Sequence, residues 1–432
     1  FLAGQGYSYV NYNIKEGLAG SMVYCMVQDH DGFIWFGTET GLSRYDGNRF
    51  VSFTSLDGQP DNEIIRLFVD SKNRIWIMPF QNKVCYYYKG KLCTDQNDSL
   101  LKKMAFKGGA VDITENKKQE VAILQISGVS VVGADNSLTE ITAPRTLFNF
   151  KNAGLGFDGG FMVHAHEHVS NYLGIYTISG NKLVHYSNLM PPSNHNSNGI
   201  YLAPDLRIMY SYADSLLFTT PSDSFVIPLE RAFNNIARVN DSLVAITSMK
   251  LTEFVNIRTG KKEDQFLENE SISTVLEDRE GNLWFASMGK GVYRLASRKF
   301  KAATLMVNGN YQPVYSLARL NNSLVLGSNN FSLWDLNLVT NRLERSHDLD
   351  DIGQGRILTL NVIGKNKILA GSDAGLLLRE GSSLSRISHS FAAKDVFIEN
   401  DTIYVGHNTA VERFVFSPFK AIRAVFLRRV TA

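Results

Sequence analysis

Three histidines in one short segment are the residues whose spacing most resembles a binding site. His164, His166 and His168 alternate in the run Met-Val-His-Ala-His-Glu-His-Val, a pattern that predicts a strand. Alternate residues of a strand share one face, so the three imidazoles are expected to lie together. Such a group can bind a transition metal, can contact a sugar or other polar ligand, or can pack between sheets. These histidines are the candidate ligand-binding residues, and we assign no metal to them.

Signatures of catalysis are absent from the sequence. It contains no Gly-x-Ser-x-Gly elbow, no zincin helix motif and no phosphate-binding loop. The glycine-rich run 154–160 has no helical pattern after it and is typical of a turn. The carboxylate pairs of glycosidases are defined by distance in space, which a sequence does not give. We therefore predict no catalytic residue, no enzymatic activity and no cofactor for this chain.

Acidic residues recur around polar turns, and tryptophans recur after them. The acidic residues are Asp29, Asp31, Asp70, Asp278 and Glu280, and the tryptophans are Trp35, Trp76 and Trp284. Aspartate side chains commonly accept turn N–H groups, so we expect these residues to cap turns. A calcium loop needs denser carboxylates than the first turn offers. A tryptophan recurring at one position of a repeat indicates packing between sheets rather than ligand stacking.

An internal repeat sets the positions of these residues. The segments 23–46, 64–88 and 272–295 share one plan, in which an apolar strand, a polar turn, a short strand with Trp, a second turn and a third strand follow in order. A fourth strand comes next, as at 48–53. Alignment on the Trp gives ten copies, at Trp35, Trp76, Ala122, Val163, Met209, Val244, Trp284, Val325, Leu369 and Tyr404. Four-stranded units of about 40 residues, repeated head to tail, are typical of β-propeller blades.

The N-terminal segment determines how the copies are divided. Residues 7–12 alternate like a fourth strand but have no first three strands of their own. They are expected to complete the seventh copy. We therefore predict an all-β chain, with a seven-bladed propeller of four-stranded blades over residues 1–298, closed by the N-terminal strand near 7–12. The first three blades of a second propeller follow over residues 299–432. A single ten-bladed ring is the structural alternative.

The sharpest copies resemble a known family. Segments 23–50, 64–93 and 272–300 are similar to the two-component regulator propeller repeat, with Asp-x-x-Gly-x-(Ile/Leu)-Trp-(Phe/Ile)-(Gly/Ala), then Gly-(Leu/Val)-x-Arg and an aromatic-ended fourth strand. Copies three to six lack the Trp. The resemblance implies the periplasmic sensor region of a membrane histidine kinase of a hybrid two-component system from Bacteroides-like bacteria. It also implies glycan-derived oligosaccharides as the signal and a kinase domain outside this chain.

Two other functions remain open at this point. A propeller face can bind a partner protein as an interaction scaffold, without a small ligand. Propellers also host glycosidases and lyases, in which case His164 and His166 are the first candidates for catalysis. An oligosaccharide partner is expected for the sensor, and a homodimer is one possible assembly.

Charge and hydropathy exclude further classes. The 44 Lys and Arg residues nearly balance the 42 Asp and Glu residues, giving a net charge of +2. This balance argues against a nucleic-acid binder. No run of about 18 apolar residues is present, so membrane attachment is expected only through a C-terminal segment outside this sequence.

The sequence begins at Phe1 without a basic and apolar leader, and both ends look cut, so we expect a piece of a longer protein.

The cysteines are too few for a disulfide framework or a zinc site. They are Cys25, Cys85 and Cys93. Cys85 and Cys93 could pair across a hairpin. Cys25 and Cys85 lie in apolar runs and are expected to be small buried residues.

Overall fold

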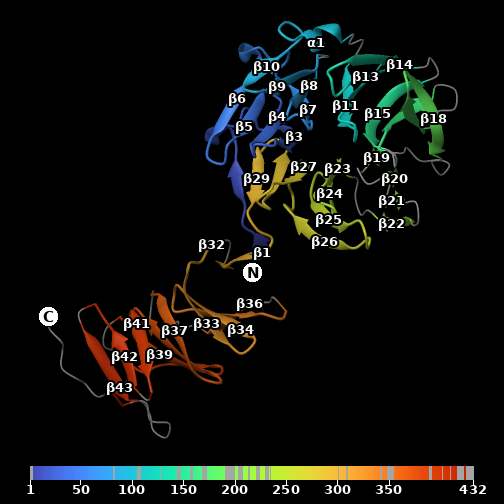
Figure 1. Ribbon diagram of the computed structural model, residues 1–432. Helices are drawn as coiled ribbons and strands as arrows, with labels where there is room; N and C mark the ends of the chain where they lie inside the picture. Colours follow the sequence, from blue (N-terminus) through green and yellow to red (C-terminus); the bar gives the residue numbers. More distant parts are fainter. Residues whose placement is uncertain are drawn as a thin grey trace. The chain divides into compact units, whose positions relative to one another are not determined.

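The computed structural model describes most of the chain. The described residues are 3–80, 83–104, 109–126, 128–143, 147–155, 159–167, 173–189, 200–202, 208–212, 215–219, 224–228, 233, 235–299, 301–307, 310–340, 343–347, 355–388, 392–400, 402–408, 410–415 and 423–424. Contacts divide the chain into two compact units. One is Tyr9–Lys299, and the other combines Phe1–Ser8 with Phe300–Ala432 (Figure 1).

The unit Tyr9–Lys299 contains seven four-stranded antiparallel sheets. Six are consecutive in sequence: β3–β6 (Val23–Gln28, Ile34–Thr38, Leu42–Tyr45, Phe50–Phe53), β7–β10 (Ile64–Val69, Ile75–Pro79, Cys85–Tyr88, Lys91–Cys93), β11–β14 (Ala110–Glu115, Val121–Gln125, Gly128–Val132, Leu138–Thr142), β15–β18 (Leu147–Leu155, Phe161–Glu167, Leu173–Ser179, Lys182–Leu189), β19–β22 (Ile200–Leu202, Ile208–Tyr212, Ser215–Thr219, Ser224–Pro228) and β23–β26 (Asn235–Arg238, Leu243–Thr247, Thr252–Asn256, Lys262–Phe266). The seventh joins β27–β29 (Ile272–Glu277, Leu283–Ser287, Val292–Leu295) to β2 (Val10–Tyr12).

The other unit contains three four-stranded sheets among its described residues. They are β33–β36 (Val314–Leu320, Ser323–Ser328, Leu333–Asn337, Leu343–His347), β37–β40 (Ile357–Gly364, Lys367–Ser372, Gly375–Glu380, Ser383–Arg386) and β41–β44 (Asp395–Glu399, Thr402–Gly406, Val411–Val415, Arg423–Ala424). Two short pairs complete it, β1 (Ala3–Tyr7) with β30 (Lys301–Thr304) and β31 (Met306–Val307) with β32 (Asn310–Tyr311).

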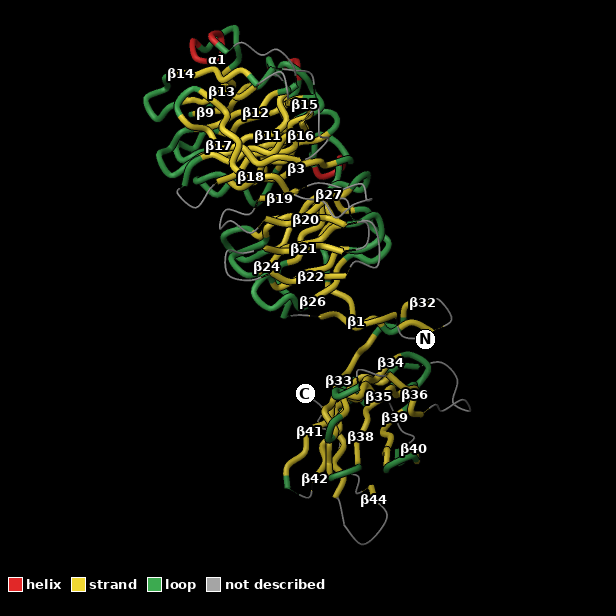
Figure 2. Tube along the Cα trace, turned by 90° about the vertical axis from the view of Figure 1, so that its right-hand side faces the viewer, coloured by secondary structure: helices red, strands yellow, loops and turns green. Residues whose placement is uncertain are grey.

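Among the described residues, helical structure is limited to connectors before first strands. The 3-10 turns η1 (Ile14–Glu16) and η2 (Ser55–Asp57) precede β3 and β7, and the short helix α1 (Ser99–Lys103) precedes β11. Strands therefore dominate both units (Figure 2). The prediction of an all-β propeller fold built from four-stranded sheets is confirmed. All ten repeat positions aligned on Trp lie on the second strand of a four-stranded sheet.

The N-terminal segment is shared between the two units. β2 is the outer strand of the sheet β27–β29, with Tyr12 opposite Val292, and it lies within the segment expected near 7–12. Strand β1 pairs instead with β30, placing Tyr7 opposite Lys301. Contacts consequently group Phe1–Ser8 with the second unit, whereas the sequence pattern assigned residues 1–298 to the first. The pattern described one strand near 7–12, and the chain forms two short strands here.

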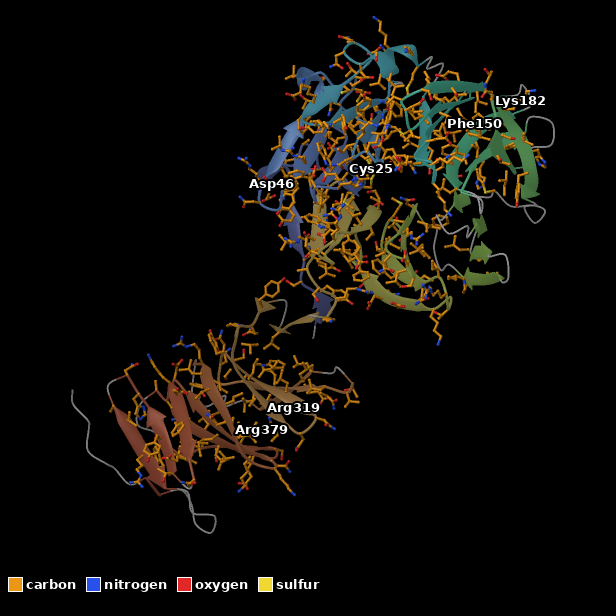
Figure 3. All side chains as sticks on the ribbon, in the orientation of Figure 1. Cys25, Asp46, Phe150, Lys182, Arg319 and Arg379 are labelled. Carbon is orange, nitrogen blue, oxygen red and sulfur yellow. The ribbon has the colours of Figure 1, made fainter. Side chains whose placement is uncertain are left out.

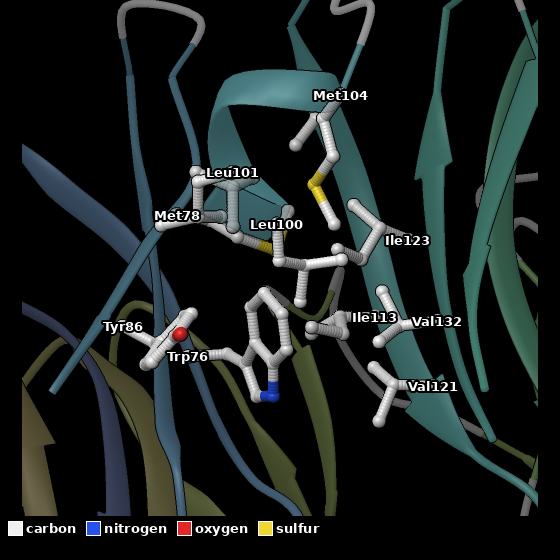
Figure 4. Close-up of a cluster of buried hydrophobic side chains, with 12 residues drawn as sticks. Trp76, Met78, Tyr86, Leu100, Leu101, Met104, Ile113, Val121, Ile123 and Val132 are labelled. Carbon is white, nitrogen blue, oxygen red and sulfur yellow. The ribbon is translucent and has the colours of Figure 1, made fainter. Parts of the chain in front are cut away.

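The core lies between the sheets. Second strands such as β4, β8 and β28 are buried along their whole length, because neighbouring sheets cover both of their faces. Trp76 illustrates this packing, since it is fully buried among side chains from the next sheet and from α1 (Figure 4). Burial of one such large side chain contributes about 1.5–3 kcal/mol. First strands of consecutive sheets pack on one another, as do β27 and β3, and they are therefore the inner strands of the ring.

Candidate functional site

One carboxylate fixes each of the sharpest repeat turns. Oδ1 of Asp29 accepts two backbone N–H groups of its turn, at 3.0 and 2.9 Å, and Oδ2 accepts the indole N–H of Trp35 at 2.7 Å. The second and seventh copies repeat the bond, to Trp76 and Trp284, at 2.8 Å in each. The predicted packing role of the tryptophans is confirmed, and the predicted turn-capping role is confirmed for Asp29, Asp70 and Asp278. These carboxylate oxygens face N–H donors, an arrangement opposite to that of a cation site.

Arginines cover the same tryptophans. Arg44 and Arg294, both on third strands, each lie with the guanidinium carbon 5.7 Å from the centre of the Trp ring of their own sheet. The second copy has no arginine on its third strand, and Arg74 from the turn lies over Trp76 at 4.9 Å instead. Arg74 also pairs with Asp70 at 2.5 Å, and both side chains are buried. Arg74, Asp70 and Trp76 therefore satisfy one another. The buried Nε atoms of Arg44 and Arg294, in contrast, have no hydrogen-bond partner among the described residues.

Hydrogen bonds link the turns between first and second strands to those of the next sheet. The backbone N–H of His30 donates to Asn73 at 2.8 Å, and the amide of Asn73 donates to Asp31 at 2.9 Å. Farther along, the Ser71 hydroxyl donates to Glu115 at 2.6 Å. Polar groups on this edge of the ring are therefore engaged in joining sheets.

At the opposite edge, where the inner strands begin, several large apolar side chains are exposed to solvent. Apolar side chains exposed there lie just before a first strand or just after a second strand, and they are Met22, Phe80, Ile126, Met249 and Met288. Apolar surfaces of this kind can cover the face of a sugar ring or a partner's side chains. The inner strands of the ring start at this same edge.

A β-bulge occurs at the same place near the start of several inner strands. In β3, β7, β11 and β27 the pairing register shifts between the first and third residues. Bulges change the direction in which a strand presents its side chains and occur often beside functional sites. The residues that follow the bulge are Cys25, Arg66, Asp112 and Thr274. In the ring, Cys25 lies toward the middle of its unit, whereas Asp46 lies at the outer rim (Figure 3).

Arg66 and Asp112 form an ion pair between neighbouring inner strands. Nη2 of Arg66 lies 2.6 Å from Oδ1 of Asp112. The two partners differ in environment, because the Arg66 side chain is 49% exposed and that of Asp112 is 2% exposed. Backbone N–H groups of Ile113 and Ala153 also donate to Asp112, at 2.7 and 3.0 Å. Burial raises the pKa of Asp112, and Arg66 and the two N–H groups oppose that rise.

This pair can do binding chemistry. A guanidinium carries five N–H donors in a planar fork that matches a carboxylate or a sulfate. Asp112 holds it from the buried side, leaving the exposed side of the fork toward solvent. The sequence analysis missed these residues. One feature of the sequence could have indicated them. At this repeat position the second and third copies carry the oppositely charged Arg66 and Asp112, whereas the first and seventh copies carry the uncharged Cys25 and Thr274.

The histidines chosen from the sequence are placed only in part. His164 lies on β16, opposite Asn152, and its side chain is fully buried. Its two ring nitrogens have no hydrogen-bond partner in the part of the chain that the structure describes. Desolvation lowers the pKa of His164 to about 3, so the imidazole is neutral near pH 7. His166 lies on the same strand, but its side chain and the whole of His168 lie outside the described residues.

The cysteines are free thiols. Cys93 stands opposite Tyr86 in the pairing of β9 with β10, so the side chain of Cys85, one residue away, points to the other face of the sheet. A pairing of Cys85 with Cys93 across the hairpin was therefore wrong. Cys85 is buried as expected, whereas Cys25 is partly exposed.

A family model matches two copies of the repeat. The two-component regulator propeller model matches residues 17–40 and 267–289, which contain the first and seventh copies of the turn and its tryptophan. These two segments are similar to the two-component regulator propeller repeat. No curated protein matches the sequence.

Solved structures extend the likeness in fold to most of the chain. The extracellular domain of a putative hybrid two-component system from B. thetaiotaomicron has a TM-score of 0.66 at 16% identity, covering 97% of this chain and 60% of its own. A second such domain from the same organism has a TM-score of 0.52 at 13% identity, with 94% and 58% covered. The chain thus spans about three fifths of these structures, and identities this low show the fold alone.

An enzyme shares part of the fold. A streptogramin B lyase has a TM-score of 0.51 at 17% identity, covering 67% of this chain and 97% of its own.

The described residues of the chain contain no helix that is long and apolar enough to cross a membrane.

Proposed function

We propose that this chain is the ligand-binding part of a periplasmic sensor in a two-component system. Its ligand is an oligosaccharide derived from a glycan, and a kinase domain outside this chain receives the signal. A ligand shifts the equilibrium between two conformations of a sensor only by binding one of them more tightly than the other. An extended propeller face provides a large contact area for this difference in affinity.

The observation that carries the proposal is the agreement of two independent features. Regulator propeller repeats are present in the sequence, and the same chain superposes over 97% of its length on the extracellular domain of a putative hybrid two-component system. The near-neutral net charge fits a small polar ligand better than a nucleic acid.

A thermal-shift screen against glycan-derived oligosaccharides tests the proposal. One sugar class that raises the melting temperature in proportion to its concentration supports sensing. Metal ions and a chelator serve as controls for a site at the histidines. If no sugar shifts the melting temperature while a pull-down with the same chain captures a partner protein, the interaction scaffold replaces this proposal. Light scattering with and without the active sugar tests whether ligand binding is linked to a homodimer.

The fold shared with a streptogramin B lyase supports a second candidate, an enzymatic propeller. His164, which the sequence placed first for catalysis, is fully buried and neutral, and this argues against its acting on a substrate. Incubation of the purified chain with the oligosaccharide that binds decides between the candidates. Turnover that releases shorter or unsaturated sugars establishes the enzyme and rejects the simple sensor.

A further inference from the structure

The geometry of Arg66 points to the class of ligand. We propose that Arg66 binds the acidic group of the signal, so that the sensor takes an oligosaccharide bearing a carboxylate or a sulfate rather than a neutral sugar. This inference rests on the proposed function for the sugar, and the anion site itself rests on the contacts of Arg66.

Arg66 has unused hydrogen-bonding capacity. Among the residues that the structure describes, its ion-pair partner is Asp112, through Nη2 alone. The Nε and Nη1 groups have no described partner, and the side chain is half exposed. By comparison, Arg356 reaches Asp373 through both Nε and Nη2, at 2.9 and 3.2 Å. The free part of the Arg66 fork is therefore available to an anion.

Asp112 supports Arg66 without competing for the ligand. Both of its oxygens accept bonds, Oδ1 from Ile113 and Arg66 and Oδ2 from the backbone of Ala153. Its side chain is buried behind the guanidinium, on the inner strand of the next sheet. Two backbone N–H groups thus fix the carboxylate, and its ion pair with Nη2 restrains the arginine. Such restraint lowers the entropy that ligand binding costs.

The neighbouring inner strand adds groups suited to sugar hydroxyls. Tyr24 lies in the bulge of β3, and its hydroxyl donates to Glu63, the residue before β7, at 3.1 Å. Cys25, which follows Tyr24, has its pKa raised to about 12, chiefly by burial, so this thiol adds no negative charge beside Arg66 near pH 7. A cation, a tyrosine hydroxyl and a carboxylate on adjacent inner strands are groups that recognise a charged sugar by hydrogen bonding.

The test compares two paired variants of the same chain. R66M with D112N removes the cation and neutralises its buried partner together, so no unpaired charge is left inside. R49M with D46N makes the same change in the Arg49–Asp46 pair, whose side chains are 78% and 27% exposed on a turn of the outer rim.

The probes are a uronate-bearing disaccharide, a sulfated disaccharide, a neutral disaccharide of the same size, and inorganic sulfate at millimolar concentration. Calorimetry gives affinities, and melting temperature reports folding and sulfate binding.

We expect an acidic disaccharide to bind the unmodified chain and the R49M/D46N variant alike, and to bind R66M/D112N at least about tenfold more weakly. The acidic disaccharide that binds more tightly shows whether the site takes a carboxylate or a sulfate.

Equal affinity of R66M/D112N and the unmodified chain overturns the inference, as does a neutral disaccharide that binds as tightly as the acidic ones. If sulfate stabilises the chain through Arg66 but no disaccharide binds, the anion site stands and oligosaccharide sensing fails. If only neutral sugars bind, sensing stands and this inference fails.

Discussion

The indole N–H of Trp35 donates to Oδ2 of Asp29 across 2.7 Å, inside a sheet where neither side chain meets water. The third copy lacks the tryptophan and changes its turn accordingly. Ala122 replaces Trp there, and Asn116 replaces the aspartate, with its amide donating to Glu120 at 2.7 Å. A buried carboxylate is retained where an indole satisfies it, and a neutral amide is used where no indole is present.

Replacement of Asp29 by alanine should destabilise the chain by about 2–4 kcal/mol, because the turn loses its cap and the indole loses its partner. W35F should cost less, since the ring volume is largely kept. The double variant should show a coupling of about 1–3 kcal/mol. Urea unfolding followed by tryptophan fluorescence measures all three. Strictly additive effects of the two changes would show that this hydrogen bond contributes nothing.

A second-strand glycine should be required only where the next sheet covers it. A Cβ added to Gly37 would lie 2.7 Å from the carbonyl oxygen of Ile64, on the next inner strand. Gly371 meets Ala393 in the same way. Gly406 occupies the same repeat position, but the nearest described atoms lie 3.7 Å away and belong to its own sheet. G37A and G371A are expected to cost about 1–3 kcal/mol and G406A less than about 0.5 kcal/mol, by urea unfolding. A cost for G406A as large as for G371A would contradict this explanation.

His164 should make the chain sensitive to acid. Burial lowers its pKa from 6.5 to about 3, so the unfolded chain binds a proton that the folded chain does not. The stability that comes from keeping this imidazole neutral is complete above pH 6.5 and is lost as pH falls toward 3, with a slope of at most about 1.4 kcal/mol per pH unit.

H164L is expected to flatten the loss of stability between pH 6.5 and 4.5, measured by urea unfolding at several pH values. H185L is the matched control, because His185 is exposed. An unchanged slope in H164L would show that His164 takes up its proton in the folded chain.

The ion pair of Arg379 with Asp335 should stabilise the second unit more than its surface pairs do. Two guanidinium nitrogens of Arg379 reach the carboxylate at 2.7 and 2.5 Å, joining third strands of adjacent sheets, and the Arg379 side chain is buried. R379M leaves a partly buried carboxylate unpaired and should cost about 2–4 kcal/mol. K367M breaks the exposed pair with Glu380 and should cost less than about 1 kcal/mol. Limited proteolysis of the region after Phe300 and urea unfolding give the comparison, and equal costs would reject it.

The repeat and the strands that form it could be predicted from the amino-acid sequence. All ten aligned positions fall on second strands, including Ala122, Val163 and Met209, where the tryptophan is missing. The reason is that a residue covered on both faces must be apolar, and that successive copies lie 35 to 46 residues apart. The helix α1 was not predicted, since it forms in a connector that the repeat does not constrain, with Asp98 as its N-cap.

The residues that meet across sheets could not be predicted from the amino-acid sequence. Arg66 and Asp112 lie 46 positions apart in the sequence, and no local pattern joins them. Their contact depends on two bulges and on the packing of consecutive inner strands. The burial of His164 was decided in the same way, because alternation along a strand tells which side chains share a face but not whether that face meets water or another sheet.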